Sequence, residues 1–209
     1  MLKMHRLTMP PHTESDRAGL RDVYANETQR AAANRIGLGL LCIVAGMLFC
    51  GVILLLVVLR FDDDGSWPEH LPPLPWQIWL STALLVLESA VLHAAVTSRS
   101  PRTVQRMLVC SLVIALAFMA AQAWTWLAWH DAVAGMDGRR IAMTGLYVLS
   151  GVHLAHVLGG LVPLSMLVWY ARGREWDERR RNHLRLTTLY WHFLDIVWIV
   201  LLVTLLLVL

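Results

Sequence analysis

Residues 36–59, IGLGLLCIVAGMLFCGVILLLVVL, form an unbroken run of small and apolar side chains without a single charge. A helix rises about 1.5 Å per residue and the hydrocarbon core of a bilayer is about 30 Å thick, so about 20 such residues cross it. The run is longer than the apolar region of a signal peptide, which has about 7 to 15 residues. We therefore expect a membrane-spanning helix that is retained in the mature protein.

Four further apolar runs of similar length follow, at residues 76–96, 107–129, 141–169 and 187–209. Only 16% of the 209 residues are charged and 57% are hydrophobic, whereas about a quarter of an average soluble domain is charged. The sequence thus predicts an all-α, polytopic membrane protein. Its five-helix bundle covers residues 36–209, and a polar, basic arm that is flexible or surface-bound covers residues 1–35.

The basic residues are divided unevenly between the two ends of the predicted helices. Fifteen of the 18 lysines and arginines fall in the arm or in the second and fourth loops, and only Arg60, Arg139 and Arg140 fall on the opposite side. The positive-inside rule then places the N-terminus in the cytoplasm and the C-terminus outside. Nucleic acid is excluded as a partner because the arginine clusters do not lie on a soluble domain, and anionic lipid is the expected partner instead.

Neither the three cysteines nor the run of three aspartates indicates a metal-binding site. Cys42, Cys50 and Cys110 fall inside the predicted spans, where a cysteine behaves as a small apolar side chain. The three consecutive aspartates at residues 62–64 could hold a divalent cation, but adjacent carboxylates on an irregular loop are more often a solvated turn. We therefore predict no metal site from either group.

Ionisable side chains inside the spans are few, and they are the natural place to look for function. Each costs at least about 2.5 to 3.5 kcal/mol at the centre of a bilayer, so it faces protein, water or another polar group. The set consists of Glu88, His93, His153, His156, His192 and Asp195. Residues three apart share a helix face, which pairs His153 with His156 and His192 with Asp195.

Histidines at equal depth on facing helices could hold a haem. At 1.5 Å per residue, His156 lies about 20 Å from the cytoplasmic end of its span, His192 about 8 Å and His93 about 5 Å. Only His93 and His192 then match, which leaves a stand-alone haem b protein as an alternative. A zinc or copper site at His153 and His156 needs further ligands that the sequence does not supply. We expect the histidines to bond across helices or to lipid headgroups, without haem or metal.

The two carboxylates have several possible roles. Glu88 and Asp195 each lie about 12 Å inside the predicted span and could share a proton if their helices touch. We favour a simpler arrangement, in which Asp195 accepts a hydrogen bond from His192 on its own helix or from a neighbouring chain. A proton-coupled transporter with Glu88 as its relay would be expected to show internal symmetry or broken helices, which the sequence lacks.

Two stretches carry a family resemblance. The first is YWHFLDIVW, with Tyr190, Trp191, His192, Phe193, Asp195 and Trp198; the second is SGVHLAHVLGG, with Gly151, His153, His156, Val157 and Gly159. The proline-rich lead into the second span, residues 71–94, and Gln122 on the third add to it. From about residue 35 onward the chain resembles the five-helix form of subunit III of the haem-copper terminal oxidases, which oxidise cytochrome c or quinol.

This resemblance implies an accessory subunit of a respiratory chain in the bacterial plasma membrane rather than the mitochondrial inner membrane. Such a subunit has no catalytic residue and no redox centre, since the haems and copper belong to partner subunits. It packs against catalytic subunit I, with subunit II in the same complex, binds phospholipid, and supports assembly, durability and proton uptake. Seven polar and aromatic residues of the two motifs and the second span are then structural or lipid contacts: His93, His153, His156, His192, Asp195, Trp191 and Trp198.

The sequence departs from this family at two positions. Many members carry a glutamate in the first of the five helices, where this chain has Ala45 and Gly46, and another in the third helix, where it reads AQAWTW at residues 121–126. Glu88 is then the remaining candidate for proton support. The departure also favours an alternative, a subunit III-like protein that accompanies a bacterial nitric oxide reductase.

The charge distribution yields a first testable prediction. A reporter enzyme that works only outside the cytoplasm, fused after Leu209, should be active, because the basic loops hold the other helix ends inside. The same reporter fused after residue 100, in the basic second loop, serves as the control and should be inactive. Activity of the second fusion in place of the first would reverse the assigned orientation.

Overall fold

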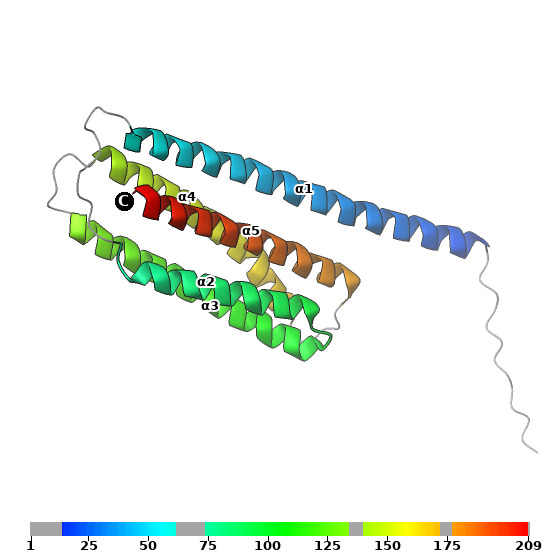
Figure 1. Cartoon of the computed structure of the whole chain (residues 1–209). Coiled ribbons are helices and arrows are strands. Elements are labelled where there is room, and N and C mark those ends of the chain that lie inside the picture. Colours follow the sequence, from blue (N-terminus) through cyan, green and yellow to red (C-terminus); the bar gives the residue numbers. More distant parts are fainter. Residues whose placement is uncertain (1–13, 62–73, 134–139, 172–176, 209) are drawn as a thin grey trace, which may run out of the picture. The chain divides into compact units, whose positions relative to one another are not determined.

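The computed structural model describes residues 14–61, 74–133, 140–171 and 177–208, and all regular elements among them are helices. They are α1 (Glu14–Phe61), α2 (Gln77–Thr97), α3 (Pro101–Val133), α4 (Arg140–Tyr170) and α5 (Glu178–Val208), shown in Figure 1. Each of the five is long and apolar enough to cross a membrane. The predicted all-α class with five spans is confirmed. The aspartates at residues 62–64 lie outside the described residues.

The helices extend beyond the apolar runs that predicted them. α1 begins at Glu14 rather than at residue 36, and α5 begins at Glu178 rather than at residue 187. Arginine and glutamate are good helix formers, so a helix continues where hydropathy ends. At the start of α5, the carboxylate of Asp177 accepts the backbone N–H of Glu178 at 2.8 Å, and its carbonyl accepts the N–H of Arg180. Asp177 thus caps this helix.

The chain divides into two compact units, Met1–Gly39 and Leu40–Leu209. The described part of the first unit is the N-terminal portion of α1. The second unit contains the rest of α1 together with α2–α5. All the ionisable residues singled out within the spans belong to the second unit.

Helices α2 and α3 lie side by side and are joined by only three residues, 98–100 (Figure 1). Ser98 ends α2 in an extended conformation, with its N–H donated to the carbonyl of Ala94. Pro101 occupies the first position of α3, where its missing N–H costs no helical hydrogen bond. α5 packs against both α2 and α4, and α3 contacts α4. Polar groups on α2, α3 and α5 can therefore meet between helices.

Helices α4 and α5 are in close contact at Gly160. A Cβ at this position would lie 3.0 Å from a ring carbon of Tyr190 and 3.4 Å from one of Trp191. The hydroxyl of Tyr190 donates to the carbonyl of His156 at 3.0 Å. Pro163 within α4 lacks an N–H for the carbonyl four residues earlier, so the helix is already weakened in this region. The close contact with α5 supports it there.

Apolar side chains make up the core of the bundle and also cover much of its surface, as in other membrane-spanning proteins. A buried cluster joins α1, α3, α4 and α5 and contains Phe49, Leu56, Trp129, Leu149, Val197 and Leu201. Many large apolar side chains, including Ile43, Met47 and Leu54, are exposed. Exposed apolar surface on this scale marks contact with lipid or with another subunit.

Gly160 provides a test of the α4–α5 contact. Gly160→Val should destabilise the bundle by about 1–3 kcal/mol, because the added carbons meet the ring of Tyr190 and the fully buried Trp191. The matched control is Gly51→Val, since a Cβ at Gly51 meets nothing within 4 Å. Unfolding midpoints in detergent would show the effect. Equal midpoints for the two variants would contradict the contact.

Candidate functional site

Glu88 lies at the interface of α2 and α3. Its side chain is 1% exposed and belongs to the buried stripe of α2, which also contains Ser81, Leu85 and Leu92. The hydroxyl of Ser111 on α3, itself fully buried, donates to Oε1 of Glu88 at 2.7 Å. The second carboxyl oxygen has no hydrogen-bond partner in the described part of the chain. Glu88 is therefore an interhelical group with one oxygen still available.

His192 is held by α2 rather than by its own helix. Its Nδ1 forms a hydrogen bond of 2.7 Å with Oγ of Ser89. The nearest oxygen of Asp195 lies 3.6 Å from the same nitrogen, which is an ion-pair distance but too long for a hydrogen bond. The favoured hydrogen bond from His192 to Asp195 is therefore replaced by one to Ser89. The cause is that Ser89, next to Glu88 in the chain, faces α5 and engages the nitrogen that Asp195 would need.

Asp195 is nearly buried, with 8% of its surface exposed. Neither of its carboxyl oxygens has a hydrogen-bond partner among the described residues. Helices α2 and α5 do touch, which was the condition for Glu88 and Asp195 to share a proton. The hydrogen bond of Glu88 goes to Ser111 instead.

His93 and His192 are neighbours, as their similar depths suggested. Their ring centroids lie 6.2 Å apart with the ring planes at 45°, and His93 is exposed on the surface of α2. Over the described ranges, no group of three or more histidine, cysteine, aspartate or glutamate residues is placed to hold a metal ion. Two imidazoles fall short of the three or four protein ligands that a zinc site uses.

His153 and His156 share a face of α4 but have different surroundings. His153 is 1% exposed and packs among three aromatic rings, with centroid distances of 6.1 Å to Phe49, 6.5 Å to Phe118 and 5.3 Å to Trp198. Neither of its ring nitrogens has a hydrogen-bond partner within the described segments, so the expected interhelical bond is absent there. His156 donates from Nδ1 to the carbonyl of Val152 on its own helix at 2.8 Å.

The two tryptophans of the α5 motif fasten that helix to its neighbours. The indole N–H of Trp198 donates to the hydroxyl of Thr82 at 3.0 Å, and this hydroxyl donates in turn to the carbonyl of Ile78. Trp191 is fully buried and lies close to Gly160. Trp198 therefore joins α5 to α2, and Trp191 fills the contact with α4.

Sequence reasoning missed the hydroxyl partners of these groups. Ser89, Ser111 and Thr82 each complete a contact with a residue that the motifs had singled out. Small hydroxyl residues inside a span often hydrogen-bond to neighbouring helices, and this is the signal that could have found them. The sequence does not show which helix each one faces.

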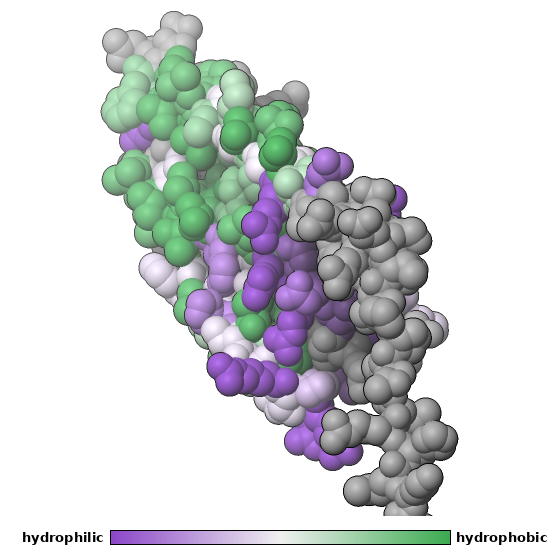
Figure 2. Space-filling view, turned by 90° about the vertical axis from the view of Figure 1, so that its right-hand side faces the viewer, coloured by the Kyte–Doolittle hydropathy of each residue, from purple (hydrophilic) through white to green (hydrophobic). Residues whose placement is uncertain are grey.

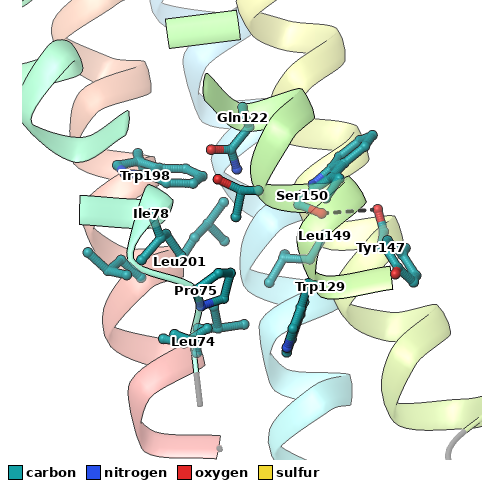
Figure 3. A pocket seen from close by; sticks show the side chains of 14 residues that line it. Leu74, Pro75, Ile78, Gln122, Trp129, Tyr147, Leu149, Ser150, Trp198 and Leu201 are labelled. Atoms are coloured by element: carbon teal, nitrogen blue, oxygen red, sulfur yellow. Dashed lines mark hydrogen bonds between the residues drawn. The ribbon is translucent and has the colours of Figure 1, made fainter. Parts of the chain in front are cut away.

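Two pockets are lined by described residues, and the second shares Trp198 with these contacts. One, of about 510 Å³, lies near the start of α3 and is lined by Arg102, Gln105, Arg106 and Val109. Figure 2 looks onto the end of the bundle where α3 and α5 begin, and it shows hydrophilic side chains gathered there beside apolar surface. The other, of about 50 Å³, lies between α2, α3, α4 and α5 and is lined mainly by apolar and aromatic side chains (Figure 3).

These features define a class of protein: a polytopic helical membrane protein whose intramembrane polar residues join its helices. Residues 65–208 match the family described as cytochrome c oxidase subunit III. The chain belongs to the cytochrome c oxidase subunit III family. Membership of this family implies a membrane oxidase complex that contains other subunits.

Individual relatives agree with this assignment. A protein of Nocardia farcinica named as probable cytochrome c oxidase subunit 3 is 27% identical over 73% of this chain and 77% of its own length. The cytochrome c oxidase subunit 3 of a Synechocystis strain is 26% identical over 79% of this chain and 71% of its own. One from Rickettsia bellii, also named as probable, is 28% identical over 65% of this chain but only half of that protein. These bacterial relatives and the five apolar helices fit a multi-pass protein of a bacterial membrane.

Proposed function

We propose that this chain is the non-redox accessory subunit III of a respiratory haem-copper oxidase, packed against catalytic subunit I in the bacterial plasma membrane. Its role is to support assembly and to prolong activity during oxygen reduction. The observation that carries the proposal is that the motif at residues 190–198 of α5 makes contacts between helices. His192 and Trp198 are both engaged by hydroxyls of α2, so they hold the bundle together and are not available for catalysis. The haems and copper belong to the partner subunits.

Phospholipid is part of the proposal, with anionic headgroups at the basic end. The pocket beside Arg102 and Arg106 supports it, because two guanidinium groups one helical turn apart suit a phosphate. His93, exposed near the end of α2, is a further contact for a lipid headgroup. In this arrangement the polar arm, residues 1–35, and the start of α5 lie at the cytoplasmic surface.

The residues at the position of the first-helix glutamate favour a second candidate function. The family's first-helix glutamate is replaced by Ala45 and Gly46, and the site is filled by apolar contacts. Ala45 is 4% exposed, and a Cβ on Gly46 would lie 3.9 Å from the ring of Phe193. A chain without this acid also suits a subunit III-like protein of a bacterial nitric oxide reductase.

Purification of the tagged chain from its own membranes in a mild detergent tests the main proposal. The complex should contain a catalytic subunit, and its reduced-minus-oxidised spectrum should be that of a haem-copper oxidase with oxygen-reducing activity. After the partners are removed, the isolated chain should hold no stoichiometric haem, iron, copper or zinc. A complex that reduces nitric oxide but not oxygen would favour the second function, and haem retained by the chain alone would contradict both.

Glu88 is the residue that we propose for proton support. Glu88→Gln keeps an oxygen that can accept from Ser111 but removes the ionisable carboxyl group. We expect the variant complex to assemble and to start at the parent rate, then to lose activity sooner during sustained turnover. A hydrophobic carbodiimide should modify Glu88 before Asp195, as peptide mass analysis would show.

The matched control is Glu178→Gln, which changes an exposed acid at the start of α5. It should age like the parent protein. If Glu88→Gln also ages like the parent and Glu88 stays unmodified, its role is purely structural. The proposal that the chain is subunit III would still stand, because it rests on the co-purification.

A further inference from the structure

The small pocket between α2, α3, α4 and α5 is lined by two residues whose polar atoms are buried without a partner. Oε1 of Gln122 and Nε1 of Trp129 have no hydrogen-bond partner in the part of the chain that the structure describes. Gln122 is 4% exposed and Trp129 is 7% exposed, so neither atom can find a partner at the surface. In Figure 3 the amide of Gln122 points into the pocket, toward Trp198. One of the two atoms accepts a hydrogen bond and the other donates one.

A hydroxyl of the lining adds a further acceptor. Thr125 lies about one turn after Gln122 on α3, and its hydroxyl donates to the carbonyl of Ala121 at 2.9 Å. The oxygen of a hydroxyl that donates can still accept a hydrogen bond. The N–H of Trp198, in contrast, is bound to Thr82. The mainly aromatic and aliphatic wall of the pocket therefore carries both acceptors and a donor.

The spacing of Gln122 and Trp129 calls for more than one bridging molecule. The two residues are about two turns apart on α3, so they share a face and their Cα atoms are separated by about 10.5 Å along the helix axis. One hydrogen bond spans only about 2.7–3.2 Å between heavy atoms. The volume of about 50 Å³ has room for two or three water molecules at roughly 10–15 Å³ each, whereas benzene occupies a cavity of about 150 Å³. Water is the occupant whose size and polarity fit.

We propose that this pocket binds a short chain of ordered water, about two or three molecules long, between Gln122 and Trp129. The water at one end donates to Oε1 of Gln122 and to the hydroxyl oxygen of Thr125. The water at the other end accepts from the indole N–H of Trp129. Each molecule then has two or three hydrogen-bond partners, within the two to four that a buried water requires. The chain satisfies two polar groups that would otherwise stay unpaired inside the bundle.

Two alternatives agree less well with this lining. A lipid acyl chain has neither a donor nor an acceptor, so it would leave both Gln122 and Trp129 unpaired. A pocket that stays dry is typical of a wholly apolar lining, and this lining carries a donor and acceptors. Both alternatives are outcomes that the measurements below can detect.

The first test is nuclear magnetic resonance on the full-length chain in lipid nanodiscs, with isotope-labelled tryptophan nitrogens. We expect a cross-peak between water and the indole N–H of Trp129, because a bound water lies at hydrogen-bond distance from it. Trp191 is the matched control, since its Nε1 is also buried without a described partner but does not line this pocket, and it should give no such cross-peak. Trp129→Phe and Trp191→Phe assign the two signals. A missing cross-peak at Trp129, or equal cross-peaks at both residues, would overturn the proposal.

A variant and a map then locate the water. Gln122→Met replaces the amide by an apolar side chain of similar length, so the cross-peak of Trp129 should be lost, while Gln105→Met, in the basic pocket at the other end of α3, should preserve it. A cryo-electron microscopy map of the parent complex needs no variant, so it does not depend on folding of a substituted chain. At a resolution that shows ordered water, density should lie about 2.7–3.2 Å from Oε1 of Gln122. A pocket without density, the continuous density of an acyl chain, or an unchanged cross-peak in Gln122→Met would each contradict the proposal.

Discussion

Hydrocarbon offers no hydrogen bonds, and this constraint shapes every polar contact in the bundle. Backbone groups are satisfied within helices, which explains why the described residues contain no strand. Polar side chains need a partner from another helix or from their own backbone. Ser81 and Thr204 take the second route and bond to the carbonyl four residues earlier. Glu88 and His192 take the first, and in doing so they determine which helices are neighbours.

Helix α2 is the centre of this arrangement because adjacent residues on it face different partners. Glu88 meets Ser111 on α3, while Ser89 meets His192 on α5. Successive residues on a helix are rotated by about 100°, so two consecutive positions can serve two neighbouring helices. Thr82, about two turns earlier, adds a second bond to α5 through Trp198. α2 is thereby fixed in rotation as well as in position, which a purely apolar interface would specify less well.

Depth could be predicted from the sequence, but rotation about the helix axis could not. Counting residues from the span ends correctly suggested that His93 and His192 could match, and their rings lie 6.2 Å apart. The same counting could not show that Nδ1 of His192 would hydrogen-bond to Ser89 rather than to Asp195. This depends on which face of α2 meets α5. The extra turns of α1 and α5 were also missed, because hydropathy detects contact with lipid and not helicity. The resemblance in the two motifs identified the family without either kind of information.

Trp198 separates two regions of different character. Its N–H is bound to Thr82, its ring lies 5.3 Å from that of His153, and the same ring lines the apolar pocket. On α5, His192 comes earlier and bonds to Ser89 of α2, with Asp195 3.6 Å from its ring nitrogen, whereas Leu201, Leu202 and Leu205 come later and line the pocket. The bundle therefore changes from polar to apolar contacts along a single helix. Because Trp198 is fixed both by a hydrogen bond and by ring contacts with Phe118 and His153, it holds this boundary in place.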